Sequence, residues 1–529
     1  MRHCEERSNL IIEQITSLHC ITLVMTYKMK NWLRKKIKTR LKNYKVIINT
    51  ADNSLPLKIS SKKRVAIVGA GIAGLSAAAN LSERGFDVTL FEKNNYIGGK
   101  VGSWQFESNN EVLRAEHGFH AFFRQYYNLR NFMKKLDIYQ HLIPIDDYII
   151  FYQDGKQQGF KGIDNTPALN IFDLRKKGIL SNRTFINPKS INYLDLLKYH
   201  PEKTFEKFDH ISFEEYANKT SMPSHLRLVF TSFARAFFAE PNKISMAELI
   251  KGFHFYFLSS DDGLIYDVLN DDFEHTFLQP IEKFIKQHQG KVKCNINIEK
   301  INYTNEKFEI DNELFDYCIL SLDAKHIKPL VQKSTGFKQY NIFNEEINGL
   351  KCTDSYAVWR IWTDRFEANK DLPFFIFTDR LKCLDSVTFY HKMEKESAQW
   401  SIKNNGGIFE LHSYSLPDAL TDENKIKEQL LQEFFHYFPE LKHLEIKHQY
   451  FQHRDDFPAF HLHQYKNRPI VKTEVPNLFL AGDWVKLPAP AMLMEAAYIS
   501  GAMAANYILR DENLQENELI SVSNFGLFA

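Results

Sequence analysis

The chain has few cysteines, and no pattern joins them. Six occur among 529 residues, none in a Cys-x-x-Cys pair and none beside a histidine at the spacing of metal ligands. We therefore expect no metal centre, no iron–sulfur cluster and no disulfide framework. Isolated thiols are typical of small buried side chains in a reducing compartment, which indicates a cytoplasmic protein.

Long apolar runs are missing as well. Residues 10–25 are interrupted by Glu13, Gln14 and His19, and they lack the small-residue cleavage site of a signal peptide. No stretch reaches the roughly 18 apolar residues that a membrane span requires. The sequence therefore predicts no transmembrane helix.

Neither sign of charge dominates. The chain has 67 Lys and Arg against 65 Asp and Glu, a net charge of +2, which argues against nucleic acid as the main partner. Phenylalanine, by contrast, is abundant at 43 copies, and aromatic residues make up 14% of the chain. Such an excess either fills a core or lines a long apolar channel, and both interpretations stay open.

A basic segment stands near the N-terminus. Residues 28–45 contain nine Lys and Arg, with apolar residues at helical spacing between them. A basic amphipathic helix of this kind lies on an anionic membrane surface, so we expect peripheral attachment to the cytoplasmic face. Two alternatives stay open: a solvated, disordered leader, or an upstream extension of a reading frame that starts at Met25 or Met29.

Residues 64–93 form a nucleotide-binding unit. An apolar strand is predicted over 64–68 and a helix over 75–84, and a second buried strand over 88–91 ends on Glu92. A lone glycine-rich turn would be weak evidence. Here strand, turn, helix, strand and acidic end agree, which favours a Rossmann-type βαβ start.

Each glycine of the turn has a separate predicted task. Gly69 makes the tight turn, Gly71 lets the backbone approach a pyrophosphate, and Gly74 lets the helix pack on the strand. The pyrophosphate would lie on the helix N-terminus, where free N–H groups favour an anion. Glu92 would accept both hydroxyls of a ribose and would repel a 2′-phosphate, which disfavours NADPH.

The sequence just beyond this unit favours FAD over NAD as the cofactor. Gly98, Gly99 and Lys100 place a glycine pair and a cation where the chain would pass the phosphates again. This segment resembles the extended FAD fingerprint of the amine oxidase and carotenoid desaturase superfamily.

The far end of the chain supplies a second corner. An apolar strand over 478–481 closes on Gly482 and Asp483, and residues 489–497 open a helix of small residues. This is an anion- and ribityl-binding corner built from distant sequence. The alternative is a plain strand–helix unit that ends the domain.

The family resemblance rests on residues 116–130, 454–460 and 478–497. These segments resemble FAD-dependent carotenoid desaturases, and among them the bacterial β-carotene desaturase/methylase type that makes aryl carotenoids. The likeness covers about residues 64–510. It implies an α/β fold in which a Rossmann-like FAD-binding domain is interleaved with a mixed α+β substrate domain. The expected parts are a basic extension over 1–62, an FAD domain from 64–125, 280–335 and 470–510, a substrate domain from 126–279 and 336–469, and a polar tail over 511–529.

The resemblance also implies roles for individual residues. The ADP half of FAD would be held by Gly69, Gly71, Gly74 and Glu92, and its adenine would contact Ile298. The pyrophosphate and ribityl side would be held by Gly98, Gly99 and Lys100, and the ribityl or phosphate also by Gly482 and Asp483. The flavin ring would face the helix N-terminus at Met494 and Glu495. His117 and His120 would lie beside the flavin ring. A core role is the alternative for either histidine alone.

The chemistry expected is desaturation of a lipophilic carotenoid. Removing a hydride and a proton from a C–H pair needs a hydride acceptor, which a flavin supplies and side chains do not. His117 or His120 would take the proton, and aromatic faces would stabilise an allylic cation that permits a methyl shift in a β-ionone ring. The alternatives are a ζ-carotene or phytoene desaturase, a flavin amine oxidase, and a non-enzymatic isoprenoid-binding protein. The sequence does not indicate the electron acceptor.

Overall fold

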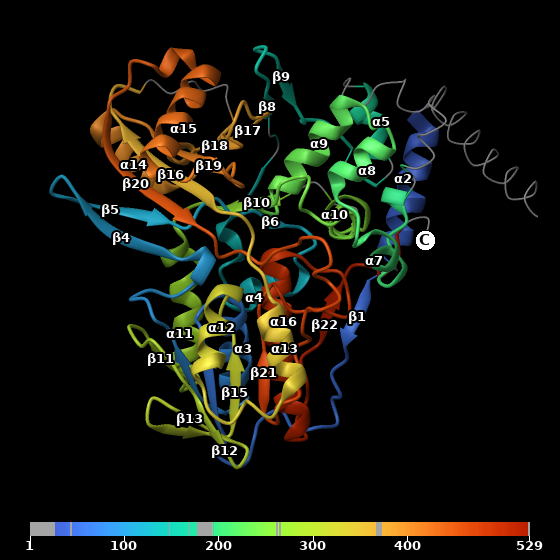
Figure 1. Ribbon diagram of the computed structural model, residues 1–529, viewed down its shortest axis with the longest axis vertical. Helices are drawn as coiled ribbons and strands as arrows, with labels where there is room; N and C mark the ends of the chain where they lie inside the picture. The colour runs from blue at the N-terminus through green and yellow to red at the C-terminus, as the bar shows by residue number, and fades with distance from the viewer. Residues whose placement is uncertain are drawn as a thin grey trace, which may run out of the picture.

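The computed structural model describes residues 27–42, 45–145, 147, 149–164, 166–167, 169–176, 193, 195–260, 263, 266–366 and 373–526. In this part of the chain, no helix is both long and apolar enough to cross a bilayer. The described residues build two large sheets and a helical lobe (Figure 1).

The lower half of the molecule in Figure 1 is built on a parallel sheet with the order β11-β3-β2-β15-β21. Its strands are β2 (Arg64–Val68), β3 (Asp87–Phe91), β11 (Lys291–Lys293), β15 (Tyr317–Leu320) and β21 (Leu478–Leu480). A small antiparallel sheet beside it contains β12 (Asn302–Thr304), β13 (Lys307–Ile310) and β14 (Glu313–Phe315). Strand β2 is buried along nearly its whole length, as a strand covered on both faces must be.

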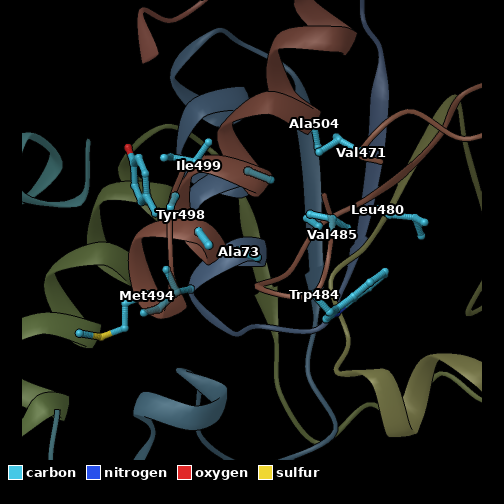
Figure 2. Packing of buried hydrophobic residues seen from close by; sticks show 14 of the residues in the cluster. Ala73, Val471, Leu480, Trp484, Val485, Met494, Tyr498, Ile499 and Ala504 are labelled. Carbon is cyan, nitrogen blue, oxygen red and sulfur yellow. The ribbon is translucent and has the colours of Figure 1, made fainter. Parts of the chain in front are cut away.

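Two helices from opposite ends of the chain pack against each other on this sheet. They are α3 (Ile72–Glu83) and α16 (Leu493–Asp511), and Figure 2 shows Ala73 of α3 beside Tyr498 and Ile499 of α16. Helix α3 is buried on almost every side, which is why its sequence is apolar all round. The other helices of this half are α4 (Tyr127–Lys135), α11 (Gln279–Gln287), α12 (Ala324–Lys333) and α13 (Asn341–Gly349).

The second sheet has seven strands in the described residues and is mixed, in the order β20-β16-β19-β18-β17-β8-β9. Its strands are β8 (Ile149–Phe151), β9 (Gln157–Gly159), β16 (Tyr356–Thr363), β17 (Phe375–Thr378), β18 (Ser386–Phe389), β19 (Ile408–Ser413) and β20 (Ile446–Arg454). The helices α14 (Lys395–Asn404) and α15 (Glu423–Tyr437) belong to this half, with a separate core centred on residues such as Leu411 and Phe434.

Smaller elements connect the halves. They are the hairpin β4 (Ser103–Ser108) and β5 (Glu111–Glu116), the sheet β6 (Phe122–Phe123), β10 (Tyr266–Leu269) and β7 (Leu142–Pro144), and the lobe of α5 (Leu169–Lys176), α7 (Lys203–Phe208), α8 (Phe213–Lys219), α9 (Ser224–Arg235) and α10 (Met246–Phe253). Helix α8 begins at a reciprocal capping box, in which Ser212 accepts from the Glu215 amide and the Glu215 side chain accepts from the Ser212 amide.

Two predicted helix boundaries are wrong. The first helix of the nucleotide-binding unit begins at Ile72 and not at residue 75. The last helix begins at Leu493 and not at Ala489, because Ala489 precedes Pro490 and a residue before proline is kept out of the helical region.

The two ends of the described chain also differ from expectation. Part of the segment predicted as a polar tail forms β22 (Leu519–Ser521), which pairs antiparallel with β1 (Val46–Asn49) from the predicted basic extension. Leu519 and Val522 are buried there. The predicted basic helix is present as α2 (Tyr27–Lys42), and its Lys30 is paired with Asp173 at 2.9 Å. The described residues of both end segments therefore belong to the folded body.

This pairing can be tested by removing one buried side chain. Leu519→Ala should lower the free energy of unfolding by about 2–5 kcal/mol, because it leaves a cavity under β22. Glu518→Ala, an exposed neighbour, should change it by less than about 0.5 kcal/mol. Urea unfolding measures both variants, and equal midpoints for the two would show that the C-terminal strand is not packed.

Candidate active site

A cavity of about 560 Å³ lies at the carboxyl ends of the parallel strands. Val68 and Phe91, which end β2 and β3, line it, as do Ser321 and Gly482, which follow β15 and β21. In open parallel sheets, ligands bind in the crevice at this edge.

Most of the residues expected at the site meet in this one cavity. It is lined by Gly69, Gly71, Glu92, Gly98, Gly99, Lys100, His117, His120, Ile298, Gly482, Asp483 and Met494. Gly74 and Glu495 do not line it.

The glycines of the first turn show why a side chain is absent at each position. Gly69 has a φ of +105°, and a Cβ there would lie 2.9 Å from the Ser321 carbonyl oxygen. A Cβ on Gly74 would lie 2.0 Å from the Gly69 oxygen, so the helix could not approach the turn. A Cβ on Gly71 would meet no protein atom within 4 Å. Since Gly71 lines the cavity with ordinary φ, the only space its missing side chain leaves free is that of a ligand.

Glu92 is buried and holds the turn in place. Its Oε2 accepts from the Ala70 amide at 3.0 Å, and its Oε1 accepts from the Asn94 amide at 2.9 Å. The Gly98 amide donates to the Ala70 carbonyl at 2.8 Å, which brings the second glycine segment against the first. Each carboxylate oxygen keeps a further lone pair with which it can accept from a ribose hydroxyl.

The second corner is fixed by hydrogen bonds to both neighbouring elements. The Gly482 amide donates to Ser500 Oγ on α16 at 2.8 Å, and the Trp484 indole donates to the Leu322 carbonyl after β15 at 2.9 Å. Trp484 lies fully buried beside Val485 and Leu480 (Figure 2). Asp483 is thereby held at the cavity wall, and burial raises the pKa of its carboxyl although Lys100 opposes the shift.

The expectation for Glu495 is corrected. Its carboxylate turns away from the cavity and accepts from the amides of Asn128 at 2.8 Å and Leu129 at 3.1 Å, so it caps the N-terminus of α4. The start of α16 does reach the cavity, through Leu493 and Met494. Leu493 has a φ of +49°, a strained conformation for a leucine.

Buried charges of both signs meet in the middle of the cavity. Burial works against the charge of Lys100, but Asp483, Asp456 and Asp323 outweigh it and raise the pKa of its ammonium group. Burial likewise opposes the charge of Asp456, yet Lys100, His117, Tyr356 and Arg454 lower its pKa to about 2. The network therefore stays charged at neutral pH, in a place where water screens it little.

The two histidines are both neutral at neutral pH. Burial lowers the pKa of His117 well below its ordinary value and that of His120 to about 4. His120 Nδ1 lies 2.7 Å from the Gly118 carbonyl oxygen, and His117 Nε2 lies 2.9 Å from the Tyr356 hydroxyl. Their ring centroids are 6.2 Å apart. Neutral imidazoles at the cavity wall are able to accept a proton.

Nine aromatic side chains line the cavity in groups of contacting rings, which together are called its aromatic end. Its walls carry Phe119, Phe123, Tyr126, Phe238, Tyr266, Phe375, Phe377, Tyr414 and Phe457. Phe119 stacks on Phe375 with centroids 4.3 Å apart, and Phe238 stacks on Phe457 at 3.7 Å. Phe238 has a φ of +57°, so its backbone is strained, and it lines the same cavity as the strained Leu493. Part of the aromatic excess of the sequence therefore lines a channel.

The residues at the cavity fit an FAD molecule. The open space above Gly71, the acid at Glu92 and the second corner suit the two polar halves of a dinucleotide. The aromatic end leaves an apolar chamber beyond them. When bound, a flavin supplies hydride acceptance.

Sequence analysis missed Tyr356, Asp456 and the wall residues of the second sheet. Asp456 stood in a segment noted for its resemblance, but no role was assigned to it. Tyr356 and Phe375 lie in strands whose alternation shows burial and not proximity to a cavity.

Comparison with known proteins gives a family match over most of the chain. The family model described as flavin containing amine oxidoreductase matches residues 72–509. The carotenoid phi-ring synthase of Streptomyces griseus is 31% identical, covering 87% of this chain and 90% of that protein. Its counterpart in Chlorobaculum tepidum is 24% identical over 90% of this chain and 93% of that protein.

Solved structures agree on the fold. Putrescine oxidase bound to putrescine has a TM-score of 0.62 at 14% identity, covering 85% of this chain and 99% of that chain. An oxidoreductase from Methanosarcina mazei has a TM-score of 0.60 at 15% identity, covering 83% and 99%.

The open space at Gly71 yields a direct test of cofactor binding. Gly71→Val should give folded protein without flavin, because its side chain fills only ligand space. Gly349→Val is the matched control, since a Cβ there also meets no atom closer than 4.0 Å but lies outside the cavity. Absorbance of the purified proteins measures flavin per chain. Stoichiometric flavin in Gly71→Val would contradict the assignment of this corner.

Proposed function

This chain belongs to the family of flavin-containing amine oxidoreductases, and from that membership we propose that it is an FAD-dependent enzyme that desaturates a ring of a cyclic carotenoid to an aromatic ring. The observation that carries the proposal is the aromatic chamber adjoining a dinucleotide-shaped polar end in one cavity. The two phi-ring synthases matched over nearly their whole lengths support the choice of substrate.

The chamber suits a hydrocarbon better than an amine. Nine aromatic side chains line it, and the acid next to Phe457 in the chain, Asp456, already interacts with cations. Lys100 and Arg454 lower the pKa of Asp456, so its charge is balanced before an ammonium group could approach. A carotenoid end ring would bury its methyl groups against these rings, and their faces would stabilise an allylic cation.

The chain's own task in the reaction is to hold the ring, exclude water and remove protons. Each desaturation takes a hydride and a proton from the ring, and two are needed to turn a ring with one double bond into an aromatic one. Migration of a methyl group from the quaternary ring carbon frees that carbon for the new double bonds, so no methyl donor is required. His117 and His120, neutral and at the cavity wall, would accept the protons.

Flavin reduction under anaerobic conditions tests this function. A cyclic carotene supplied in lipid vesicles should bleach the flavin, because the ring donates a hydride to it and no oxygen is present to reoxidise the reduced flavin. Putrescine should leave the flavin oxidised. Carotene that fails to bleach the flavin, while a primary amine does so readily, would replace the proposal with an amine oxidase.

We also propose that α2 holds the enzyme on an anionic membrane surface, where such a substrate dissolves. Lys30 forms an ion pair with Asp173, and Arg34 forms one with Asp164. The charges of these two residues are therefore balanced within the protein. Lys35, Lys36 and Lys38 form no ion pair with any described residue, and Trp32 on the same helix is 60% exposed. Cations beside an exposed tryptophan are typical of interfacial helices.

Neutralising this face should weaken vesicle binding. The triple variant Lys35→Gln, Lys36→Gln, Lys38→Gln removes about 1 kcal/mol per charge, which lowers affinity for phosphatidylglycerol vesicles on the order of 100-fold. The triple variant Lys338→Gln, Lys403→Gln, Lys442→Gln removes the same charge from exposed sites elsewhere and should bind as wild type. Co-sedimentation at low salt compares them. Equal binding by the two variants would refute a membrane contact at α2.

A further inference from the structure

Two buried side chains and one half-buried side chain form a hydrogen-bonded row that starts at the cavity wall. His117 Nε2 lies 2.9 Å from Tyr356 Oη, and Tyr356 Oη lies 2.7 Å from Asp456 Oδ1. His117 and Tyr356 are 4% and 1% exposed. The residues come from three distant segments, the loop after β5, the start of β16 and the loop after β20.

The direction of each hydrogen bond in the row is fixed by chemistry. Asp456 is ionised beside Lys100 and Arg454, so its carboxylate only accepts. Tyr356 has one hydroxyl proton and must donate it to Asp456. The phenol oxygen can then only accept from His117, which requires the proton of the imidazole to be on Nε2.

The Nε2–H tautomer leaves Nδ1, the other ring nitrogen of His117, without a proton. With the proton on Nε2, His117 Nδ1 carries a lone pair, and it makes no hydrogen bond with any described residue. His120 differs, because its Nδ1 donates to the Gly118 carbonyl and a backbone hydrogen bond to Lys100 also favours its charged form. A neutral base needs a free lone pair, and His117 has one.

We propose that Tyr356 and Asp456 are positioning residues that hold His117 as the Nε2–H tautomer, so that Nδ1 receives the proton that the substrate loses. This inference rests on the proposed function. After a hydride has left the ring, the C–H bond beside the cation breaks, its electron pair becomes the new C=C bond, and the proton bonds to Nδ1. The substrate becomes neutral and His117 becomes an imidazolium.

Asp456 also stabilises the imidazolium form of His117 by its negative charge. The groups that act most strongly on His117 are Arg454, Lys100, His120 and Asp456. Among these four, Asp456 alone favours a positive ring. Its charge reaches the ring through the Tyr356 hydroxyl, which accepts from Nε2–H both before and after proton transfer.

The tautomer is measurable in the resting protein by the ¹⁵N chemical shifts of labelled histidine. His117→Gln identifies the His117 signals by their loss. Wild type should show a protonated Nε2 and an unprotonated Nδ1, and Tyr356→Phe should show a mixture. Tyr437→Phe is the matched control, because it removes a part-buried 2.7 Å hydrogen bond to Asp379 outside the cavity and should leave the His117 signals unchanged.

Kinetics add a second readout. Because proton loss follows hydride loss, Tyr356→Phe should lower kcat for formation of the desaturated product on the order of 100-fold, with KM within about threefold of wild type. Asp456→Asn keeps an acceptor for Tyr356 but removes the charge, so the tautomer should persist while the acid limb of the pH–rate profile moves to lower pH. Asp456→Glu should restore the wild-type profile in part.

The two hypotheses fail separately. A wild-type His117 with its proton on Nδ1, or unchanged His117 signals in Tyr356→Phe, would overturn the positioning role whatever the substrate. Carotene that does not reduce the flavin of wild type would overturn the proposed function. The tautomer measurement would still decide whether Tyr356 and Asp456 position His117.

Discussion

The close contact between α3 and α16 holds both halves of the site together. A Cβ on Gly501 would lie 2.0 Å from the Ala73 carbonyl oxygen, so only glycine allows the two helices this near. Ser76 Oγ donates to the Tyr498 carbonyl at 2.8 Å across the same contact. Since α3 starts at the first glycine turn and α16 starts at the second corner, their packing sets the distance between two groups of residues more than 400 positions apart.

The remaining features of the cavity follow from this arrangement. The edge of the parallel sheet contributes glycines and acids to its wall, and the second sheet contributes aromatic rings such as Phe375 and Phe377. Lys100, Asp456 and Arg454 line the same cavity. Charges are costly to bury singly, and here they offset one another. A polar cofactor and an apolar substrate can thus share one space.

Sequence analysis found the parts of the site that are encoded locally. Gly69, Gly71, Gly74 and Glu92 follow a spacing that the backbone of a βαβ turn demands, so residue types alone reveal it. The row from His117 to Asp456 has no such spacing. The pairing of β16 with β20 brings Tyr356 near Asp456, and His117 comes from a third segment of the chain. The side chain of Glu495 was misplaced because the start of a helix does not show where its first-turn side chains point.

The chain ends were misjudged for a related reason. Strand β22 is three residues long, and a strand this short is stable only because β1 lies beside it. The start of α16 lies beyond Pro490, a boundary signal that is present in the sequence.

The most direct test of the central claim is the pigment produced in a host that makes β-carotene. The mass and absorption spectrum of the extracted carotenoids decide it. We predict products that keep every carbon of β-carotene, have lost hydrogen, and contain an aromatic end ring. Unchanged β-carotene, in cells where the protein is folded and carries its flavin, would contradict the assignment of the aromatic chamber to a carotenoid ring.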